Sequence, residues 1–460
     1  MKVKRLKMQS FRGIGDLTLD FHEKEPTVLI GNNGVGKSSI LDCLAVLLSQ
    51  FTGRLAQNDV IVGSTNTTAS IQTGQINIGE IHGHVNLNIG HNREAMWSGE
   101  RDLKIRDFSD QDLYNGYKET FNEITTLLNS QKVNWFISKV QKGKSTATIS
   151  DFEKLETAIN EIRHLLESNS EANLPLVVYY PVNRAVIDIA LEIQDEHLFE
   201  QIDAYDQALN GVQISFNSFF QWFKVLEDLE NEERRDIPEY RNHQLESVRK
   251  AIYSLLSGFS NLRVRRSPLR MTVKKQGQEL IINQLSDGEK CLLAMVGDLA
   301  RRLAIANPSL PDPLQGSGVV LIDEIELHLH PKWQREIISA LTRIFPNCQF
   351  IVTTHSPQVI SQVKPEGIFI LEKTNEGVVA KRPESSFGRD SNRILEDLMG
   401  VPARPQEIKD RLHELFRLID EGNLDGARQL SQEIADIIGQ DEPELVKASV
   451  SIRRKEILKR

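Results

Sequence analysis

Cysteine is scarce in this sequence, and so are the long apolar runs that mark membrane proteins. Cys43, Cys291 and Cys348 are too few and too scattered for a disulfide framework or a paired-cysteine zinc site. No segment approaches the roughly 18 uninterrupted apolar residues of a membrane span. The basic N-terminus MKVKRLKMQSFRG lacks the apolar stretch of a secretory signal. These absences predict a soluble cytoplasmic protein without a membrane partner.

An excess of positive charge is also missing, because 55 Lys and Arg residues stand against 64 Asp and Glu residues and the net charge is -9. This balance argues against a protein that coats DNA with its whole surface, but it allows a local basic channel. The composition, with 40% hydrophobic and 26% charged residues, is that of a folded globular protein. Its length suggests about three modules.

A glycine-rich loop near the N-terminus carries the strongest functional signal. The apolar run 27–30 predicts a buried strand, GNNGVGKS (31–38) follows it, and a helical pattern comes next. The loop matches G-x-x-x-x-G-K-[ST], in which backbone N–H groups and the lysine bind phosphates and the serine hydroxyl ligates Mg²⁺. The nucleotide-binding candidates are Asn32, Asn33, Gly34, Val35, Gly36, Lys37, Ser38 and Ser39, and Ser38 is also a metal ligand.

Acidic residues follow a second apolar run, 318–322. Asp323 is placed as the second Mg²⁺ ligand of a phosphate-loop enzyme. Glu324 is placed to orient or deprotonate the attacking water. One strand later, His355 lies at the sheet edge where such folds bind ligands, and we expect it to hydrogen-bond the γ-phosphate.

A capped helix start is predicted at Ser286, because Glu289 three residues later completes a capping box. An apolar helix is expected over 291–303. A capped helix N-terminus beside Gly288 is also a site for anions.

The strand and helix patterns predict an α/β fold with a mixed or parallel sheet. The runs 318–322 and 349–353 flank an amphipathic helix at 333–344, which is a βαβ arrangement. Alternation at 17–21 and across 53–95 predicts further strands. Residues 176–180 predict one buried strand, ended by Pro181.

Residues 100–260 are rich in charge and poor in glycine, and we expect mainly helices there. Helical spacing is assigned to Leu127, Leu128, Leu155, Ile159, Ile162, Leu165 and Leu166. The acidic stretches 192–206 and 227–239 are interpreted as solvated helix faces. After Pro405 the pattern is helical to the end.

Taken in order, these motifs resemble the ATP-binding cassette class, specifically its SMC/RecF-like branch. GNNGVGKS resembles the Walker A loop, LSDGE the signature, VVLIDE the Walker B motif and TTHS the switch-histidine motif. The signature departs from the family pattern at its second glycine, which is Asp287 here. The resemblance covers about 1–95 and 261–375.

The resemblance implies a P-loop head in two lobes, 1–95 and 261–400. A mainly helical insertion at 96–260 separates the lobes, and 401–460 forms a helical assembly or partner region. In that family ATP is sandwiched head-to-tail between two heads, so a homodimer is implied in which Ser286 and Gly288 face the other copy's nucleotide. Arg12 in SFRG resembles an arginine that contacts phosphates. Gln57 and Gln72 both remain candidates for the Q-loop glutamine.

Three further stretches, YYPVNRAV (179–186), FFQWF (219–223) and EIELHLHP (324–331), resemble stand-alone bacterial anti-phage defence ATPases. The PtuA ATPases of Septu systems are most similar, and the PARIS ATPases are the runner-up. PtuA implies a higher homo-oligomer that controls a separately encoded HNH nuclease, PtuB, with any DNA contact local or delegated. A RecF-like repair ATPase that binds DNA directly is the alternative hypothesis.

Other patterns have a structural and a functional interpretation. The basic run Arg263, Arg265, Arg266, Arg270, Lys274 and Lys275 is a solvated strand face or, less favoured, a nucleic-acid path. The aromatic cluster Phe216, Phe219, Phe220, Trp222 and Phe223 is helix core rather than a platform for stacked bases. We assign His328 and His330 to the segment where two heads meet, and not to a metal site.

Overall fold

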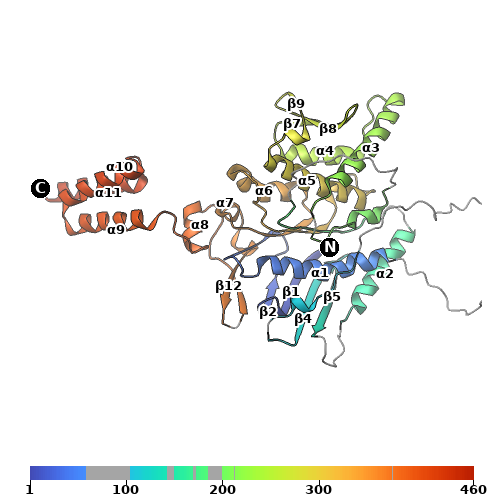
Figure 1. The fold of residues 1–460 in the computed structure, drawn as a ribbon, viewed down its shortest axis with the longest axis horizontal. Helices are drawn as coiled ribbons and strands as arrows, with labels where there is room; N and C mark the ends of the chain where they lie inside the picture. The colour runs from blue at the N-terminus through green and yellow to red at the C-terminus, as the bar shows by residue number, and fades with distance from the viewer. Residues whose placement is uncertain are drawn as a thin grey trace, which may run out of the picture.

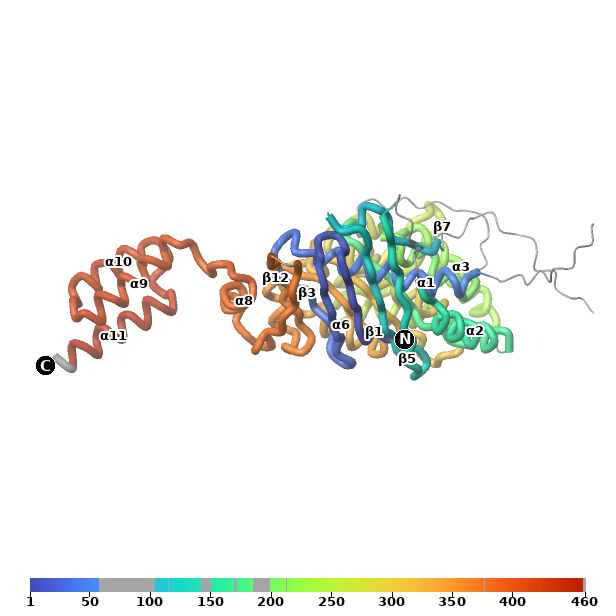
Figure 2. The backbone as a smooth tube through the Cα atoms, turned by 90° about the horizontal axis from the view of Figure 1, so that it is seen from below, coloured from blue at the N-terminus to red at the C-terminus, as the bar shows by residue number. Residues whose placement is uncertain are grey.

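Two sheets form the centre of a head, and a separate helical bundle lies at the C-terminal end of an elongated molecule (Figure 1). Figure 2 shows the same bundle extending away from the head in a view turned by 90°. The structure is a computed structural model that describes residues 1–57, 104–114, 116–141, 150–168, 172–184, 199–211, 213–375 and 377–459.

The larger sheet has six strands in the order β13-β12-β3-β11-β10-β6. They are β3 (Thr27–Gly31), β6 (Leu176–Tyr180), β10 (Gly318–Ile322), β11 (Cys348–Thr353), β12 (Ile368–Thr374) and β13 (Gly377–Lys381). All neighbours pair in parallel except β12 and β13. Every residue of β6, β10 and β11 is buried, as expected for strands covered on both faces. The predicted α/β fold with a mixed sheet is confirmed.

The smaller sheet is antiparallel, in the order β2-β1-β4-β5. Its strands are β1 (Lys2–Phe11), β2 (Ile14–Asp20), β4 (Glu119–Leu128) and β5 (Gln131–Val140). Leu17 and Leu19 are buried on β2 and alternate with exposed neighbours, as the sequence predicted. A third sheet of β7 (Phe259–Arg266), β8 (Leu269–Lys275) and β9 (Gln278–Ile281) lies beside the helices of the head (Figure 1).

Helices connect and cover these sheets. They are α1 (Lys37–Ala56), α2 (Glu153–Ser168), α3 (Phe216–Asp236), α4 (His243–Leu255), α5 (Asp287–Ala306), α6 (Pro331–Ile344), α7 (Pro357–Ile360) and α8 (Ser391–Asp397). Helix α1 contacts strands of both central sheets. Among the described helices, α1 alone is long and apolar enough to cross a membrane, but 78% of its apolar window is buried inside the protein. It is therefore a core helix of the head.

Within its described residues, the segment 96–260 forms the expected helices but also contributes strands to both central sheets. Its described residues include α2, α3 and α4, but also β4 and β5 of the smaller sheet and β6 of the larger one. Leu127 and Leu128, expected in a helix, lie in β4, which pairs with β1. The prediction of a helix from the spacing of apolar residues is wrong there, because pairing with a distant strand decides the conformation of an apolar segment.

The prediction of strands over 53–95 is wrong for its first four residues. Residues 53–56 belong to α1, where burial in the core stabilises the helix. Residues 58–95 of that stretch lie outside the described residues.

The aromatic cluster of α3 is core, as predicted: Phe216, Phe219, Phe220, Trp222 and Phe223 are all buried. The ring of Phe219 packs against Gly297 of α5 so closely that a Cβ atom at Gly297 would lie 3.0 Å from it. A glycine at this position therefore lets α3 and α5 approach each other.

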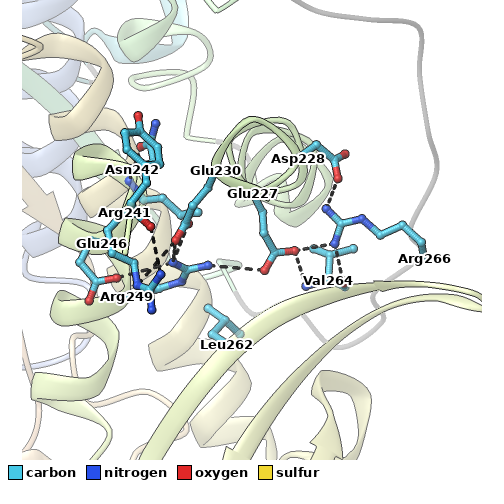
Figure 3. Close-up of polar contacts among 12 residues, drawn as sticks. Glu227, Asp228, Glu230, Arg241, Asn242, Glu246, Arg249, Leu262, Val264 and Arg266 are labelled. Carbon is cyan, nitrogen blue, oxygen red and sulfur yellow. Dashed lines mark hydrogen bonds and ion pairs between the residues drawn. The ribbon is translucent and has the colours of Figure 1, made fainter. Parts of the chain in front are cut away.

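Two acidic residues of the stretch 227–239 depart from the predicted solvated face. Glu227 and Glu230 are buried on α3 (Figure 3). Arg249 on α4 binds Glu230 at 2.8 Å and reaches Glu227 at 3.5 Å. Arg266 on β7 also binds Glu227, whose carboxylate accepts the main-chain N–H of Val264 at 3.0 Å. Buried carboxylates require such partners, which lie on other elements and leave no local sequence signal.

The C-terminal bundle consists of α9 (Gln406–Glu421), α10 (Leu424–Ile438) and α11 (Pro443–Lys459). Its core is separate from the core of the head and contains Ile408, Leu412, Leu415, Ile419, Ala427, Ile434, Leu445, Ala448 and Ile452. The residues between α8 and α9 join the bundle to the head.

Candidate nucleotide site

Four adjacent parallel strands end at one edge of the larger sheet. Their carboxyl ends lead into the glycine-rich loop 31–36 after β3, Thr354 after β11, Asp323 after β10 and Pro181 after β6. Ligands bind at this edge in open α/β sheets. The fold therefore brings together the loop, the acidic pair and His355, which are far apart in the sequence.

The loop 31–36 needs its glycines for two different reasons. Gly31 has a φ of 146°, and a Cβ atom there would lie 2.5 Å from the carbonyl oxygen of Leu371. Gly34 and Gly36 have φ values of 75° and 106°. Only glycine adopts such angles freely. The loop thus turns at the N-terminus of α1, where unpaired N–H groups favour anions.

Lys37 is the cation of this loop. Its side chain is 7% exposed, and its ammonium group donates hydrogen bonds to the carbonyl oxygens of Gly31 at 2.9 Å and Asn32 at 3.1 Å. Burial lowers the pKa of Lys37, whereas Asp323, Glu324 and Glu326 oppose this effect. A poorly hydrated ammonium group beside the unpaired backbone N–H groups of the loop is suited to bind a polyphosphate.

The acidic pair after β10 is held by Thr353 of β11. The Thr353 hydroxyl donates to the carboxylate of Asp323, which is 3% exposed, and accepts the main-chain N–H of Glu324 at 2.7 Å. Ser38, in the first turn of α1, offers a hydroxyl. Carboxylate and hydroxyl oxygens are the donors that Mg²⁺ prefers, so the residue types at this edge fit that ion.

Glu324 has a left-handed backbone with a φ of 47°. A non-glycine residue in this region costs about 1–3 kcal/mol unless its surroundings hold it there. Besides Thr353, those surroundings include Arg184, which donates hydrogen bonds to the carbonyl oxygens of Asp323 and Glu324, the latter at 2.7 Å. Sequence reasoning missed Arg184 because its partners lie 139 and 140 residues away.

His355 is held by Glu326, a second residue that sequence reasoning missed. The Glu326 carboxylate accepts the main-chain N–H of His355 at 2.5 Å and the hydroxyl of Thr354 at 2.7 Å. The loop after β10 therefore fixes the turn after β11.

The helix that begins after Ser286 is capped as predicted. The Ser286 hydroxyl donates to Glu289 at 2.8 Å and accepts the Glu289 N–H at 3.4 Å. Burial raises the pKa of Glu289, but hydrogen bonds from Lys275 and Ser286 outweigh burial and hold that pKa below its ordinary value. A Cβ atom at Gly288 would lie 2.6 Å from the carbonyl oxygen of His328. The start of α5 thus packs directly on the loop after β10 of the same chain.

Several predicted residues have other partners in the structure. Arg12 forms ion pairs with Asp42 on α1 and with Asp112. The imidazole of His330 caps α6, accepting the N–H of Lys332 at 3.2 Å. Gln57 follows the last residue of α1, and Gln72 lies outside the described residues, so both remain candidates for the Q-loop glutamine.

Half of the basic run is neutralised within the chain. Arg265 binds Glu279 at 2.8 Å, Lys275 binds Glu289 at 2.6 Å, and Arg266 pairs with Glu227. These pairs favour a structural role of the strands over a nucleic-acid path.

Comparison with known proteins matches residues 1–360 to the family described as AAA ATPase domain. The Retron Ec83 probable ATPase of Escherichia coli is 29% identical over 99% of this chain and 87% of its own length. The Retron Vc95 probable ATPase of Vibrio cholerae serotype O1 biovar El Tor is 30% identical over 92% of this chain and 85% of its own length. The Septu protein PtuA of Bacillus thuringiensis is 26% identical over 47% of this chain and 56% of its own length.

The predicted resemblance to PtuA is thus confirmed over part of the chain. The retron ATPases, which the sequence motifs did not suggest, match nearly all of it.

Proposed function

This chain belongs to the AAA ATPase domain family, and from that premise we propose that it is the ATP-driven sensor subunit of an anti-phage defence complex. As a member of this family it is an ATPase. One observation carries the proposal for the site: the loop with Lys37, the acidic pair and His355 meet at one sheet edge. The similarity to retron and Septu ATPases over most or part of the chain supports the role in defence.

Each residue of the site has a proposed role. Asn32 to Ser39 hold the phosphates of ATP, with Lys37 as the neutralising cation. Ser38 and Asp323 hold Mg²⁺, which offsets the phosphate charge when bound. Glu324 orients or deprotonates the attacking water. His355, whose main chain Glu326 fixes, hydrogen-bonds the γ-phosphate.

The proposed active form is a head-to-tail homodimer. In it Ser286 and Gly288 contact the nucleotide bound by the other copy, and Arg12 approaches the phosphates after leaving its ion pairs. The bundle at 401–460 has its own core and joins dimers into a higher oligomer or binds the partner. The proposed location is the cytoplasm.

The proposed partner is a separately encoded nuclease, of the HNH type if the system is like Septu. ATP occupancy of the head restrains the nuclease, and a fall in occupancy or a phage signal releases it. DNA contact is delegated to that partner, since the basic run on β7 and β8 is half neutralised.

Two variants test the assignment of the site. Lys37→Ala should abolish ATP binding, because no other loop side chain supplies a cation. Glu324→Gln should bind ATP with the normal affinity, lose about 100-fold or more of kcat and accumulate as a dimer in ATP. The measurements are equilibrium binding of a fluorescent ATP analogue, phosphate release and mass photometry. Hydrolysis by Glu324→Gln at the wild-type rate would reject Glu324 as the base.

The defence role is tested by purifying the untagged protein with the products of its neighbouring genes and measuring their masses. A co-purifying nuclease supports the proposal. Salt-sensitive DNA binding by the chain alone, without a nuclease partner, would favour direct DNA repair instead.

A further inference from the structure

Arg184 is a buried guanidinium group beside the proposed catalytic base. Its side chain is 1% exposed, and it follows β6, next to β10 in the larger sheet. Its terminal nitrogens donate to the carbonyl oxygens of Asp323 and Glu324. Its Nε atom is buried and has no hydrogen-bond partner among the described residues. A buried and incompletely satisfied charge contributes poorly to stability, so stability alone is a weak reason for its presence.

The geometry of the two carbonyl groups that accept hydrogen bonds from Arg184, those of Asp323 and Glu324, explains why an arginine is suited to this position. Successive carbonyl groups of an extended strand point to opposite sides. The carbonyl groups of two successive residues can accept hydrogen bonds from the same guanidinium group only where the backbone turns. The backbone turns in this way at Glu324, which has a φ of 47°. The planar guanidinium group has two terminal nitrogens that donate in a fixed geometry, whereas a lysine offers one point charge.

Arg184 also lies next to the helix that begins at the signature motif. Burial lowers the pKa of Arg184, while Cys291 on α5, Glu326 and Asp323 oppose that effect. A second contact joins the same parts, because Gly288 at the start of α5 packs on the carbonyl group of His328. The loop after β10 is therefore held against α5 at two points.

We infer that Arg184 is a positioning residue for ATP hydrolysis, which clamps the carbonyls of Asp323 and Glu324 and keeps Glu324 in its left-handed conformation against α5. This inference rests on the proposed role of Glu324 as the base. Within the part of the chain that the structure describes, the hydrogen bonds of Arg184 go to the carbonyl oxygens of Pro181, Asp323 and Glu324 and none goes to the loop 31–36. We therefore expect Arg184 to act on kcat and not on ATP affinity.

The test compares Arg184→Met, Arg184→Lys and a control, with kcat expressed per ATP-binding site so that unfolded protein does not count. Arg184→Met should bind ATP within about twofold of wild type and lose about 30-fold or more of kcat, as expected for a misplaced base. Arg184→Lys should recover part of that loss, because one of the two carbonyls regains a donor.

Arg302→Met is the matched control. Arg302 on α5 is 8% exposed, pairs with Asp298 at 2.7 Å and donates to the backbone carbonyls of Ala204 and Asp206, which are not part of the Asp323–Glu324 turn. Its loss should lower the melting temperature at least as much as Arg184→Met and leave kcat per site near wild type.

A double variant separates positioning from general destabilisation. If Arg184 acts through Glu324, Arg184→Met combined with Glu324→Gln should be no slower than Glu324→Gln alone. Additive losses, or a kcat of Arg184→Met above half of wild type, would overturn the inference. If Glu324→Gln itself keeps its activity, the proposed function fails, which is a different result from the failure of Arg184 alone.

Discussion

The hydroxyl group of Thr353 accepts a hydrogen bond of 2.7 Å from the main-chain N–H of Glu324. The same hydroxyl donates to the carboxylate of Asp323. One buried side chain on β11 therefore orients both acidic residues at the end of β10. This relationship leads to the first of five predictions.

Thr353→Val keeps the shape of the side chain and removes its hydroxyl. The N–H of Glu324 then lacks a partner, so we expect the free energy of unfolding to fall by about 1–3 kcal/mol. We also expect kcat to fall by about 10-fold while ATP affinity is kept, because the acidic pair loses alignment. Urea unfolding and phosphate release measure the two effects. Thr353→Ser retains the hydroxyl and should stay near wild type; equal losses in both variants would contradict the assignment.

Two glycines of the loop should respond differently to alanine. At Gly31 a Cβ atom would lie 2.5 Å from the Leu371 carbonyl oxygen, so Gly31→Ala should lose about 2–4 kcal/mol of unfolding free energy. Gly34 has no heavy atom within 4 Å of such a Cβ atom, so Gly34→Ala should lose only the backbone term of about 1–2 kcal/mol. Urea unfolding of both variants gives the comparison. Equal losses would show that the approach of β12 is not the constraint at Gly31.

Arg249→Met should destabilise the head strongly, because it leaves Glu230 and Glu227 buried without this partner (Figure 3). The expected loss is about 3–5 kcal/mol. Adding Glu230→Gln should recover much of it, since the remaining buried charge is then smaller. Chemical denaturation at pH 7 measures both. Arg417→Met, which breaks exposed pairs with Glu414 and Glu421 on α9, is the control and should change stability little.

All three cysteines should be unreactive in the folded protein. Cys43, Cys291 and Cys348 are buried, and burial raises each thiol pKa, that of Cys348 to about 12. A raised thiol pKa lowers the fraction of reactive thiolate at pH 8. Labelling with a disulfide reagent at pH 8 should therefore be about 100-fold slower in buffer than in guanidinium chloride. A rapidly labelled thiol in the native protein would contradict this burial.

Ending the chain after residue 400 should leave the head intact. The bundle has a core of its own, whereas Ile394, Leu398 and Met399 pack with the core of the head. The shortened protein should bind ATP with normal affinity but lose higher-order assembly, measured by mass photometry. Loss of ATP binding would show that the head depends on the bundle.

The sequence alone predicted much of the fold and of the site. The loop 31–38, the buried strand before Asp323, the cap at Ser286 and the core cluster of α3 were all predictable, because residues close together in the chain carry those signals. The placement of β4 beside β1 was not predictable, because strand pairing between distant segments overrode the helical spacing at Leu127 and Leu128.

The tertiary structure alone decided which groups support the acidic pair. Arg184 and Thr353 reach the acidic pair from a neighbouring loop and a neighbouring strand, and Glu326 in the same way holds the main chain of His355. It also decided that Glu227 and Glu230 are buried and paired. The physical reason is the same in each case: a hydrogen bond or ion pair acts over a few ångströms in space, whatever the separation of its partners along the chain.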